Sequence, residues 1–151
     1  MVCRLVSCLF IAISLLLAGC ERQQSIDVLD SEPVTLLADE RTLFINYWAV
    51  WCIPCLEEMP VLSDFREANL TSAEVYAFNF DQPEIEKLRA DVAHLDVQIP
   101  SLLEDPAPLL GTETPTVLPT TLVVKNGEIV DLLIGPQTSE SLAASLAKVP
   151  Q

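Results

Sequence analysis

The sequence predicts an α/β fold with a mixed central β-sheet and helices packed on both of its sides. Residues 42–48 and 75–80 are apolar enough for buried strands, and a segment with helical spacing follows each of them. Residues 120–125 and 128–134 are joined by Asn126-Gly127, a pair that favours the tight turn of a β-hairpin. Strands that alternate with helices, followed by a hairpin and a last helix, lead to this layered arrangement.

The composition fits one acidic globular domain. The chain has 151 residues, with 22 acidic and 8 basic side chains and a formal net charge of −14. This charge argues against a nucleic-acid-binding protein, because nothing in the chain could neutralise a run of phosphates. It also argues against a polybasic contact with anionic lipid. Half of the residues are hydrophobic, which argues against intrinsic disorder.

The first 19 residues resemble a bacterial signal peptide. One basic residue, Arg4, precedes an apolar run of 15 residues, which is shorter than the about 20 residues that a membrane-spanning helix needs. The run ends in Leu17-Ala18-Gly19-Cys20, which resembles a lipobox, and this resemblance implies cleavage before Cys20 and lipidation of its side chain. The acyl chains would hold the domain on the extracytoplasmic, periplasmic face of a bacterial membrane. A plain cleaved signal and an uncleaved helix are the alternatives.

The folded domain is expected over residues 34–151, after a polar linker over residues 20–33. Its first helix is predicted over residues 54–69, where apolar side chains recur at helical spacing: Leu56, Met59, Leu62 and Phe65. Pro60 lies inside this helix and should kink it.

In the second half of the domain, the elements are predicted from helix-capping residues and from prolines that interrupt regular structure. A helix is expected over residues 83–95 with Asp81 as its N-cap, then a short strand over residues 99–103 and a proline-rich loop over residues 106–116. The last helix should end near Lys148 and take its N-cap from one of two hydroxyl side chains, Thr138 or Ser139.

The cysteines separate into groups by their position in the chain: Cys3, Cys8, Cys20, Cys52 and Cys55. The first two would leave with the signal and the third would be lipidated, so that Cys52 and Cys55 remain. A disulfide between residues three apart closes almost no loop and stabilises a fold little, so this pair should be reactive, metal-binding or incidental. Zinc needs four ligands and the chain offers one histidine, His94, so we predict no metal site.

The position of the cysteine pair favours reactivity. Cys52 lies where a predicted strand passes into a predicted helix, and unpaired N–H groups at a helix N-terminus favour a thiolate over a thiol. Residues three apart on a helix lie roughly 5–6 Å from each other, which fits a disulfide. Cys52 could therefore attack a partner disulfide, and Cys55 could resolve the mixed disulfide, with Pro54 stiffening the first turn.

Two motifs resemble a known family. The segment Trp48-Ala-Val-Trp-Cys-Ile-Pro-Cys-Leu-Glu-Glu-Met-Pro60 is similar to the W-A-x-W-C-x-P-C-x-x-E-x-P pattern of the thioredoxin superfamily, and most of all to its TlpA/ResA-like, membrane-anchored thiol-disulfide oxidoreductases. The later segment Val117-Leu118-Pro119-Thr120-Thr121 resembles the family's x-P-T-T motif, in which a cis proline faces the dithiol. The resemblance covers about residues 33–148 and implies a thioredoxin-like fold.

The resemblance also implies roles for individual residues. It makes Cys52 the exposed nucleophile and Cys55 the resolving thiol. Leu118-Pro119 would be a backbone platform that pairs with an extended substrate segment. Trp51 would flank the dithiol, and a packing role for this tryptophan is compatible with that position.

One position departs from thioredoxin itself. Thioredoxin has a buried aspartate six residues before its first cysteine, and this chain has Asn46 there, which cannot accept a proton. The proton acceptor for the resolving step must then come from elsewhere, and Glu57, Glu58 and a water are the candidates. Glu58 matches a recurring family acid, but a glutamate on a surface helix is more often simply solvated. Asn79 and Asp81 follow the second strand and are further neighbours of the dithiol, and His94 is assigned no function.

These observations predict an extracytoplasmic thiol-disulfide oxidoreductase. Its redox-active group would be the Cys52–Cys55 disulfide, and we expect no bound cofactor. Its partners would be protein thiols or disulfides and a membrane thiol-electron transporter. We expect no nucleic acid among its partners. The resemblance favours a reductant in cytochrome c maturation or oxidase assembly. One alternative is a copper assembly factor, a class that uses a wider cysteine spacing and a histidine near the later hairpin. A second is a non-enzymatic binding module in which the dithiol is vestigial.

Overall fold

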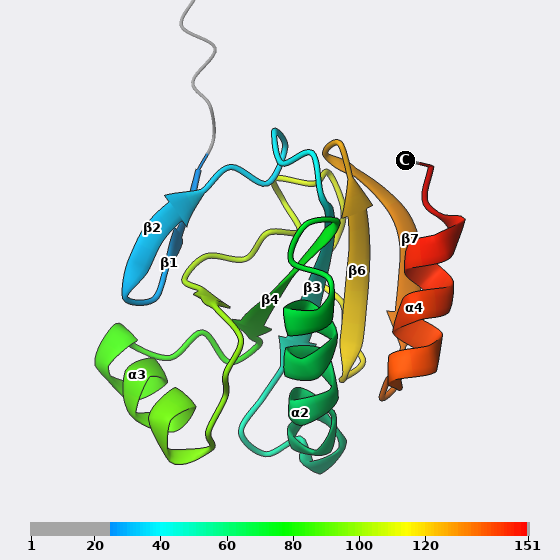
Figure 1. Ribbon diagram of the computed structural model, residues 1–151. Coiled ribbons are helices and arrows are strands. Elements are labelled where there is room, and N and C mark those ends of the chain that lie inside the picture. The colour runs from blue at the N-terminus through cyan, green and yellow to red at the C-terminus, as the bar shows by residue number, and fades with distance from the viewer. Residues whose placement is uncertain (1–24, 151) are drawn as a thin grey trace, which may run out of the picture.

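The computed structural model describes residues 25–150 and forms one seven-stranded sheet with three helices in this range (Figure 1). The strands lie in the order β2-β1-β5-β4-β3-β6-β7. Their bounds are β1 Ile26–Val28, β2 Ser31–Val34, β3 Thr42–Trp48, β4 Ala73–Asn79, β5 Ser101–Leu102, β6 Thr120–Lys125 and β7 Glu128–Ile134. The helices are α2 Ile53–Ala68, α3 Ile85–His94 and α4 Ser139–Lys148.

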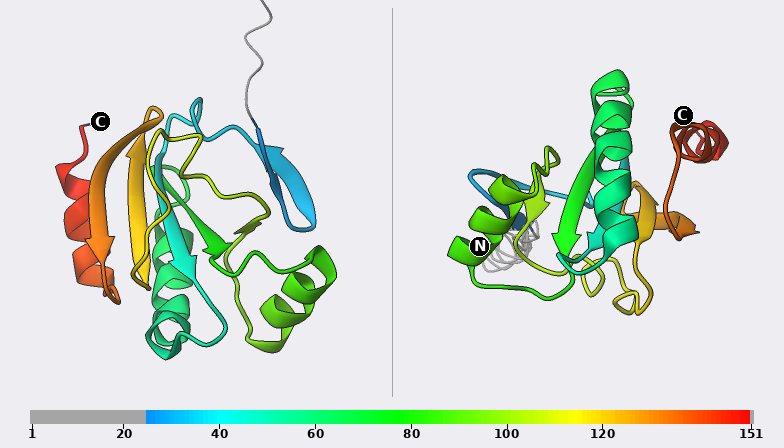
Figure 2. Two further views of the ribbon diagram at one scale, coloured as in Figure 1. Left: turned by 180° about the vertical axis from the view of Figure 1, so that it is seen from behind. Right: turned by 90° about the horizontal axis from the view of Figure 1, so that it is seen from below.

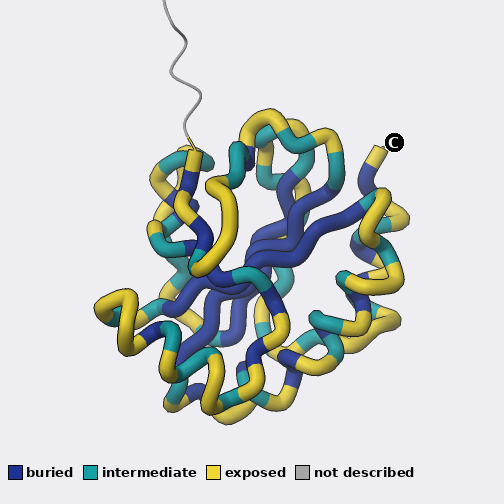
Figure 3. Tube along the Cα trace, turned by 60° about the vertical axis from the view of Figure 1, so that its left-hand side comes forward, coloured by how far each residue is buried: buried dark blue, intermediate teal, exposed yellow. Residues whose placement is uncertain are grey.

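Strands β3 and β4 form the buried centre of the sheet. They run parallel, from the pair Thr42 and Ala73 to the pair Trp48 and Asn79, and every residue of both strands is buried. Figure 3 shows these strands as a continuous dark band through the middle of the molecule. Strand β6 pairs with β3 in the antiparallel direction, so the sheet is mixed, as predicted.

The three helices of residues 25–150 contribute to the core on one face of the sheet. Buried side chains from each helix belong to a single cluster, with Met59 from α2, Leu88 from α3 and Leu142 from α4. The cluster on the opposite face contains loop residues such as Leu36 and Ala107, and no helical residue is among its described members. In Figure 2 (right) α2 and α4 lie on the same side of the sheet. This differs from the expected packing of helices on both sides.

The handedness of the chain connections explains why α2 and α3 lie on the same face. The chain steps from β3 through α2 to β4, and then through α3 to β5, and both steps go in the same direction across the sheet. Connections between parallel strands are right-handed, so two steps in one direction place both helices on the same face.

The N-terminal part of the described chain is a hairpin rather than the linker expected through residue 33. Strand β1 pairs with β2 and also joins the sheet through β5, where Val28 lies opposite Leu102. Asp30 in the turn accepts hydrogen bonds from the guanidinium of Arg89, which connects this hairpin to α3. The expected signal peptide and the lipidation site at Cys20 lie outside the described residues.

The C-terminal elements agree with their predicted positions. Asn126 and Gly127 have positive φ angles of 53° and 77°, as a type I′ hairpin turn requires. Helix α4 begins after Thr138, whose hydroxyl accepts a hydrogen bond from the N–H of Ser141 in a capping box. Within residues 25–150, no helix combines the length and the apolar character needed to cross a lipid bilayer.

Candidate active site

A disulfide joins Cys52 and Cys55 at the point where β3 leads into α2. Cys52 is the N-cap of the helix, and its carbonyl accepts hydrogen bonds from the N–H groups of Cys55 and Leu56. The two Cα atoms lie 5.3 Å apart, the separation expected for residues one turn apart. Cys55 is fully buried and Cys52 is 5% exposed, so Cys52 is the more accessible of the two residues but less open than the expected exposed nucleophile.

Apolar side chains beside the disulfide face solvent. Trp51 is 61% exposed, and Ile53 and Pro54 in the first turn of α2 are also exposed. The indole N–H of Trp51 donates a hydrogen bond of 2.8 Å to Asp81, which follows β4. Asp81 is therefore a partner of Trp51, and the expectation that it caps the next helix is wrong, because α3 begins four residues later with Glu84 as its N-cap.

The Leu118-Pro119 segment reaches the same end of the sheet. Its peptide bond is cis, and β6 begins directly after it with Thr120 paired to Tyr47 near the end of β3. Leu118 packs against the hydrophobic cluster that contains both cysteines. The carbonyl of Pro119 accepts a hydrogen bond from Gly135, so this segment is fixed between β3 and the end of β7.

Glu58 is buried beneath the disulfide-bearing turn, and the expectation of a solvated surface glutamate is wrong. It is 2% exposed and lies one helical turn after Cys55 on α2. One carboxylate oxygen accepts a 2.7 Å hydrogen bond from the side-chain amide of Asn46, and the other accepts a 2.7 Å bond from the backbone N–H of Gln137. Burial raises the pKa of this carboxyl group, and the two hydrogen bonds oppose that rise.

Asn46 connects β3 to this carboxylate and to β6. Its Nδ2 also donates a 3.0 Å hydrogen bond to the hydroxyl of Thr121, and both residues are buried. Its Oδ1 is buried as well and has no hydrogen-bond donor among residues 25–150. From the sequence, Asn46 was noted only because it stands where thioredoxin has an aspartate. No feature of the sequence predicted that Gln137 would contact Glu58.

The other candidates lie outside this cluster or at its edge. Glu57 is exposed on α2, and His94 is exposed at the end of α3. The side chain of Asn79 accepts a hydrogen bond from the N–H of Asp81 and so shapes the turn beside Trp51. Among residues 25–150, no group of three or more His, Cys, Asp or Glu side chains is arranged to hold a metal ion.

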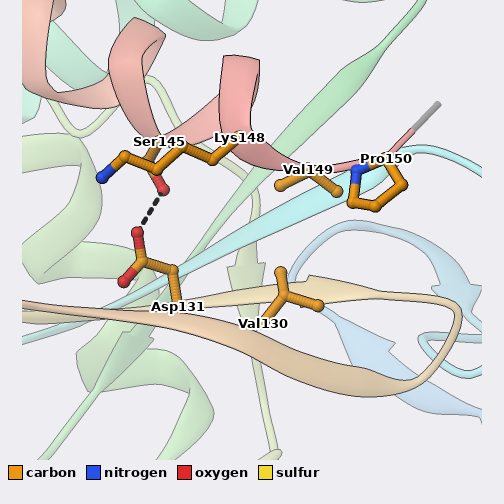
Figure 4. Close-up of a pocket in the computed structure, with 6 residues that line it drawn as sticks. All are labelled: Val130, Asp131, Ser145, Lys148, Val149 and Pro150. Carbon is orange, nitrogen blue, oxygen red and sulfur yellow. Dashed lines mark hydrogen bonds between the residues drawn. The ribbon is translucent and has the colours of Figure 1, made fainter.

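A separate cavity of about 280 Å³ lies between β7 and the end of α4 (Figure 4). Asp131 and the buried Ser145 form a hydrogen bond of 2.8 Å across it, and Lys148 and Val149 also line it. Neither cysteine of the disulfide is among its lining residues.

The chain is similar to proteins named thiol-disulfide oxidoreductase and thioredoxin-like protein. The chain is 31% identical over 109 residues to the thiol-disulfide oxidoreductase ResA of Bacillus cereus, covering 71% of this chain and 62% of that protein. It is 28% identical over 112 residues to the thioredoxin-like protein YneN of Bacillus subtilis, covering 72% of this chain and 65% of that protein. The chain thus spans less than two thirds of the length of these relatives. No protein-family model matches it.

Solved structures establish the fold. StoA from Bacillus subtilis superimposes with a TM-score of 0.68 at 21% identity, over 81% of this chain and 94% of that one. The exposed lipoprotein thioredoxin Etrx1 from Streptococcus pneumoniae gives a TM-score of 0.72 at 17% identity, over 83% of this chain and 98% of that one. With its mixed sheet and its Cys52–Cys55 pair at the start of α2, the chain has the thioredoxin-like fold.

Proposed function

We propose that this protein is a thiol-disulfide oxidoreductase that exchanges its Cys52–Cys55 disulfide with cysteine pairs of other proteins. The proposal rests on one observation, a disulfide that spans the first turn of α2 with a buried carboxyl group one turn further along the helix. The similarity to ResA, which is named a thiol-disulfide oxidoreductase, supports it.

The positions of the two sulfurs assign their roles. Cys52 is the more accessible of the two residues and lies at the helix N-terminus, where the N–H groups of the first turn stabilise a thiolate. Cys52 is therefore the attacking nucleophile. Cys55 is fully buried and can reach only the sulfur of Cys52 itself, which makes it the resolving thiol.

The exchange in the reducing direction has two steps. The Cys52 thiolate attacks one sulfur of a substrate disulfide, which forms a mixed disulfide and releases the first substrate thiolate. Cys55 then loses its proton and attacks the Cys52 sulfur. This re-forms the Cys52–Cys55 disulfide and releases the second substrate thiolate, so two electrons pass from the protein to the substrate. A further reductant of the dithiol class must restore the cysteine pair.

Glu58 is the proton acceptor in the second step. It lies on the same helix face as Cys55, and both side chains are excluded from water. Burial raises the pKa of Glu58, so its carboxylate is a stronger base than an exposed glutamate. Asn46 cannot take a proton and Glu57 is exposed, so neither can replace it.

The substrate segment would lie between two features that flank the disulfide. Trp51 and Pro54 are exposed on one side, and Leu118-Pro119 occupies the neighbouring end of β6. Leu118 supplies backbone groups for pairing with an extended peptide, and Trp51 supplies apolar contact area.

The cellular role follows the ResA resemblance. The protein would be a lipoprotein anchored through Cys20 on the extracytoplasmic face of a bacterial membrane, and Etrx1 is itself named an exposed lipoprotein. It would reduce protein disulfides in cytochrome c maturation or oxidase assembly, with electrons from a membrane thiol transporter.

The test is a trapping experiment with Cys55→Ala in the full chain. Without its resolving thiol, the variant should hold substrates as mixed disulfides on Cys52 that dithiothreitol releases and mass spectrometry identifies. Cys52→Ala is the matched control and should hold none. Equal capture by the two variants would contradict the proposal. The redox equilibrium with glutathione decides the direction, since a reductant should lie nearer the thioredoxin value of about −270 mV than the strongly oxidising value of about −120 mV.

A further inference from the structure

The hydrogen bonds around Glu58 fit only one of its two protonation states. Both carboxyl oxygens accept a hydrogen bond, one from Nδ2 of Asn46 and one from the N–H of Gln137. These two groups can donate but cannot accept. A carboxylate is satisfied by this arrangement, whereas a protonated carboxyl group would point its hydrogen at another donor.

The acceptor that a protonated Glu58 needs is already present in the same amide. Oδ1 of Asn46 is buried and has no donor among residues 25–150. A half-turn of the amide would exchange Oδ1 and Nδ2 and bring Oδ1 opposite Glu58. No described residue donates to the present position of Oδ1, so nothing there holds the amide in one orientation.

Thr121 fits both orientations of the amide. Its hydroxyl now accepts the 3.0 Å hydrogen bond from Nδ2 of Asn46. A hydroxyl both donates and accepts, so after the half-turn it can donate its own hydrogen to Oδ1. An aspartate in place of Asn46 would lack this property, since its carboxylate could not donate to ionised Glu58.

We propose that Asn46 is a positioning residue whose side-chain amide turns with the protonation of Glu58, donating to the carboxylate and accepting from the acid. This rests on the proposed function of Glu58 as the acceptor of the Cys55 proton. The amide would keep Glu58 hydrogen-bonded before and after it takes that proton. The contacts of Glu58 from β3 and from the segment before α4 are uncharged. On α2 its titratable neighbours are Glu57, whose side chain is exposed, and Cys55, which does not ionise while it forms the disulfide with Cys52.

The experiment follows the amide directly in the oxidised full chain, in detergent and without substrate. The ¹⁵N–¹H signals of the Asn46 side chain and the carboxyl ¹³C signal of Glu58 are recorded by NMR as the pH is lowered. Both sets should shift with the same midpoint, and the cross-peak between the Asn46 amide protons and Thr121 should be lost on the acid side. Asn46 signals that stay unchanged while Glu58 titrates would overturn the proposal.

Glu58→Gln supplies a reference for the turned state. Its carbonyl can keep the hydrogen bond from Gln137, which places its NH₂ group opposite Asn46 and requires Oδ1 there. Its Asn46 signals should match the acid limit of the wild type at every pH, and a match to the neutral limit would contradict the proposal. Glu57→Gln, on the exposed face of α2, is the matched control and should titrate like the wild type.

If Glu58→Gln does not fold, the wild-type titration alone decides. Because no substrate is present, a failure of this proposal is also distinguishable from a failure of the proposed activity, which the trapping experiment measures separately.

Discussion

Replacing Glu58 with glutamine should slow the resolving step of disulfide exchange and leave the first step unchanged. The substitution keeps the shape of the side chain and removes its ability to accept a proton. Cys55 is fully buried and Glu58 is 2% exposed, so water has little access to replace the lost base. A positioned general base contributes about 10²–10⁴-fold to a proton-transfer step, and we expect the resolving rate at neutral pH to fall by at least about 100-fold.

The assay separates the two steps in time. The reduced protein is mixed with a chromogenic aromatic disulfide in a stopped-flow instrument, where attack by Cys52 releases the first coloured thiolate and attack by Cys55 releases the second. Glu58→Gln should keep the first phase and delay the second, with the mixed disulfide accumulating between them. Raising the pH should partly restore the second phase, because bulk hydroxide then removes the Cys55 proton.

Glu57→Gln is the matched control, since Glu57 is the exposed neighbour of Glu58 on the same helix. It should show wild-type rates in both phases. A resolving rate in Glu58→Gln within about twofold of the wild type would refute the role of Glu58, provided that the unfolding free energy of the variant lies within about 3 kcal/mol of the wild-type value.

The remaining predictions concern stability and are checked by urea denaturation. Because burial raises the pKa of Glu58 above 4.5, the native state binds more protons than the unfolded state above that pH, so the unfolding free energy of the wild type should fall as the pH rises through the folded pKa. Glu58→Gln should lack this component, and an identical pH slope in both proteins would contradict it. Thr138→Ala removes the N-cap of α4 and should cost about 1 kcal/mol, whereas no loss would show that the capping box contributes nothing. Leu62→Ala empties a fully buried position and should cost about 2–5 kcal/mol, and a smaller loss would mean that the core closes around it. Asp81→Ala releases the exposed indole of Trp51 and should cost less than about 1 kcal/mol while changing the tryptophan fluorescence, and an unchanged spectrum would count against the contact in solution.

The central strands and the hairpin were predictable because their signals are local. Strand β3 is buried on both faces and is mostly apolar, and Asn126-Gly127 selects the turn between β6 and β7 without help from the rest of the chain. The N-terminal hairpin was missed because β1 and β2 have only three and four residues, too few to show a periodic pattern, and they are placed by pairing at the sheet edge.

The two cysteines of the site could be predicted from the sequence, but the contacts of the residues around them could not. Cys52 and Cys55 were found from their spacing and from the helix start after a strand. Glu58 accepts a hydrogen bond from Gln137, which lies 79 residues away, and no periodicity in α2 could predict such a contact. The partner of Asp81 could not be foreseen either, since Trp51 is 30 residues distant and capping a helix is the common role for such a residue.

The most direct measurement counts thiols during one turnover. The full chain, reduced and freed of reductant, is mixed with an excess of a peptide that contains a disulfide, and thiols are counted by alkylation and mass spectrometry. Two thiols should disappear from Cys52 and Cys55 for every two that appear on the peptide. Cys52→Ala, which retains Cys3, Cys8, Cys20 and Cys55, should reduce almost none. Equal reduction of the peptide by the wild type and by Cys52→Ala would contradict a dithiol exchange at this site.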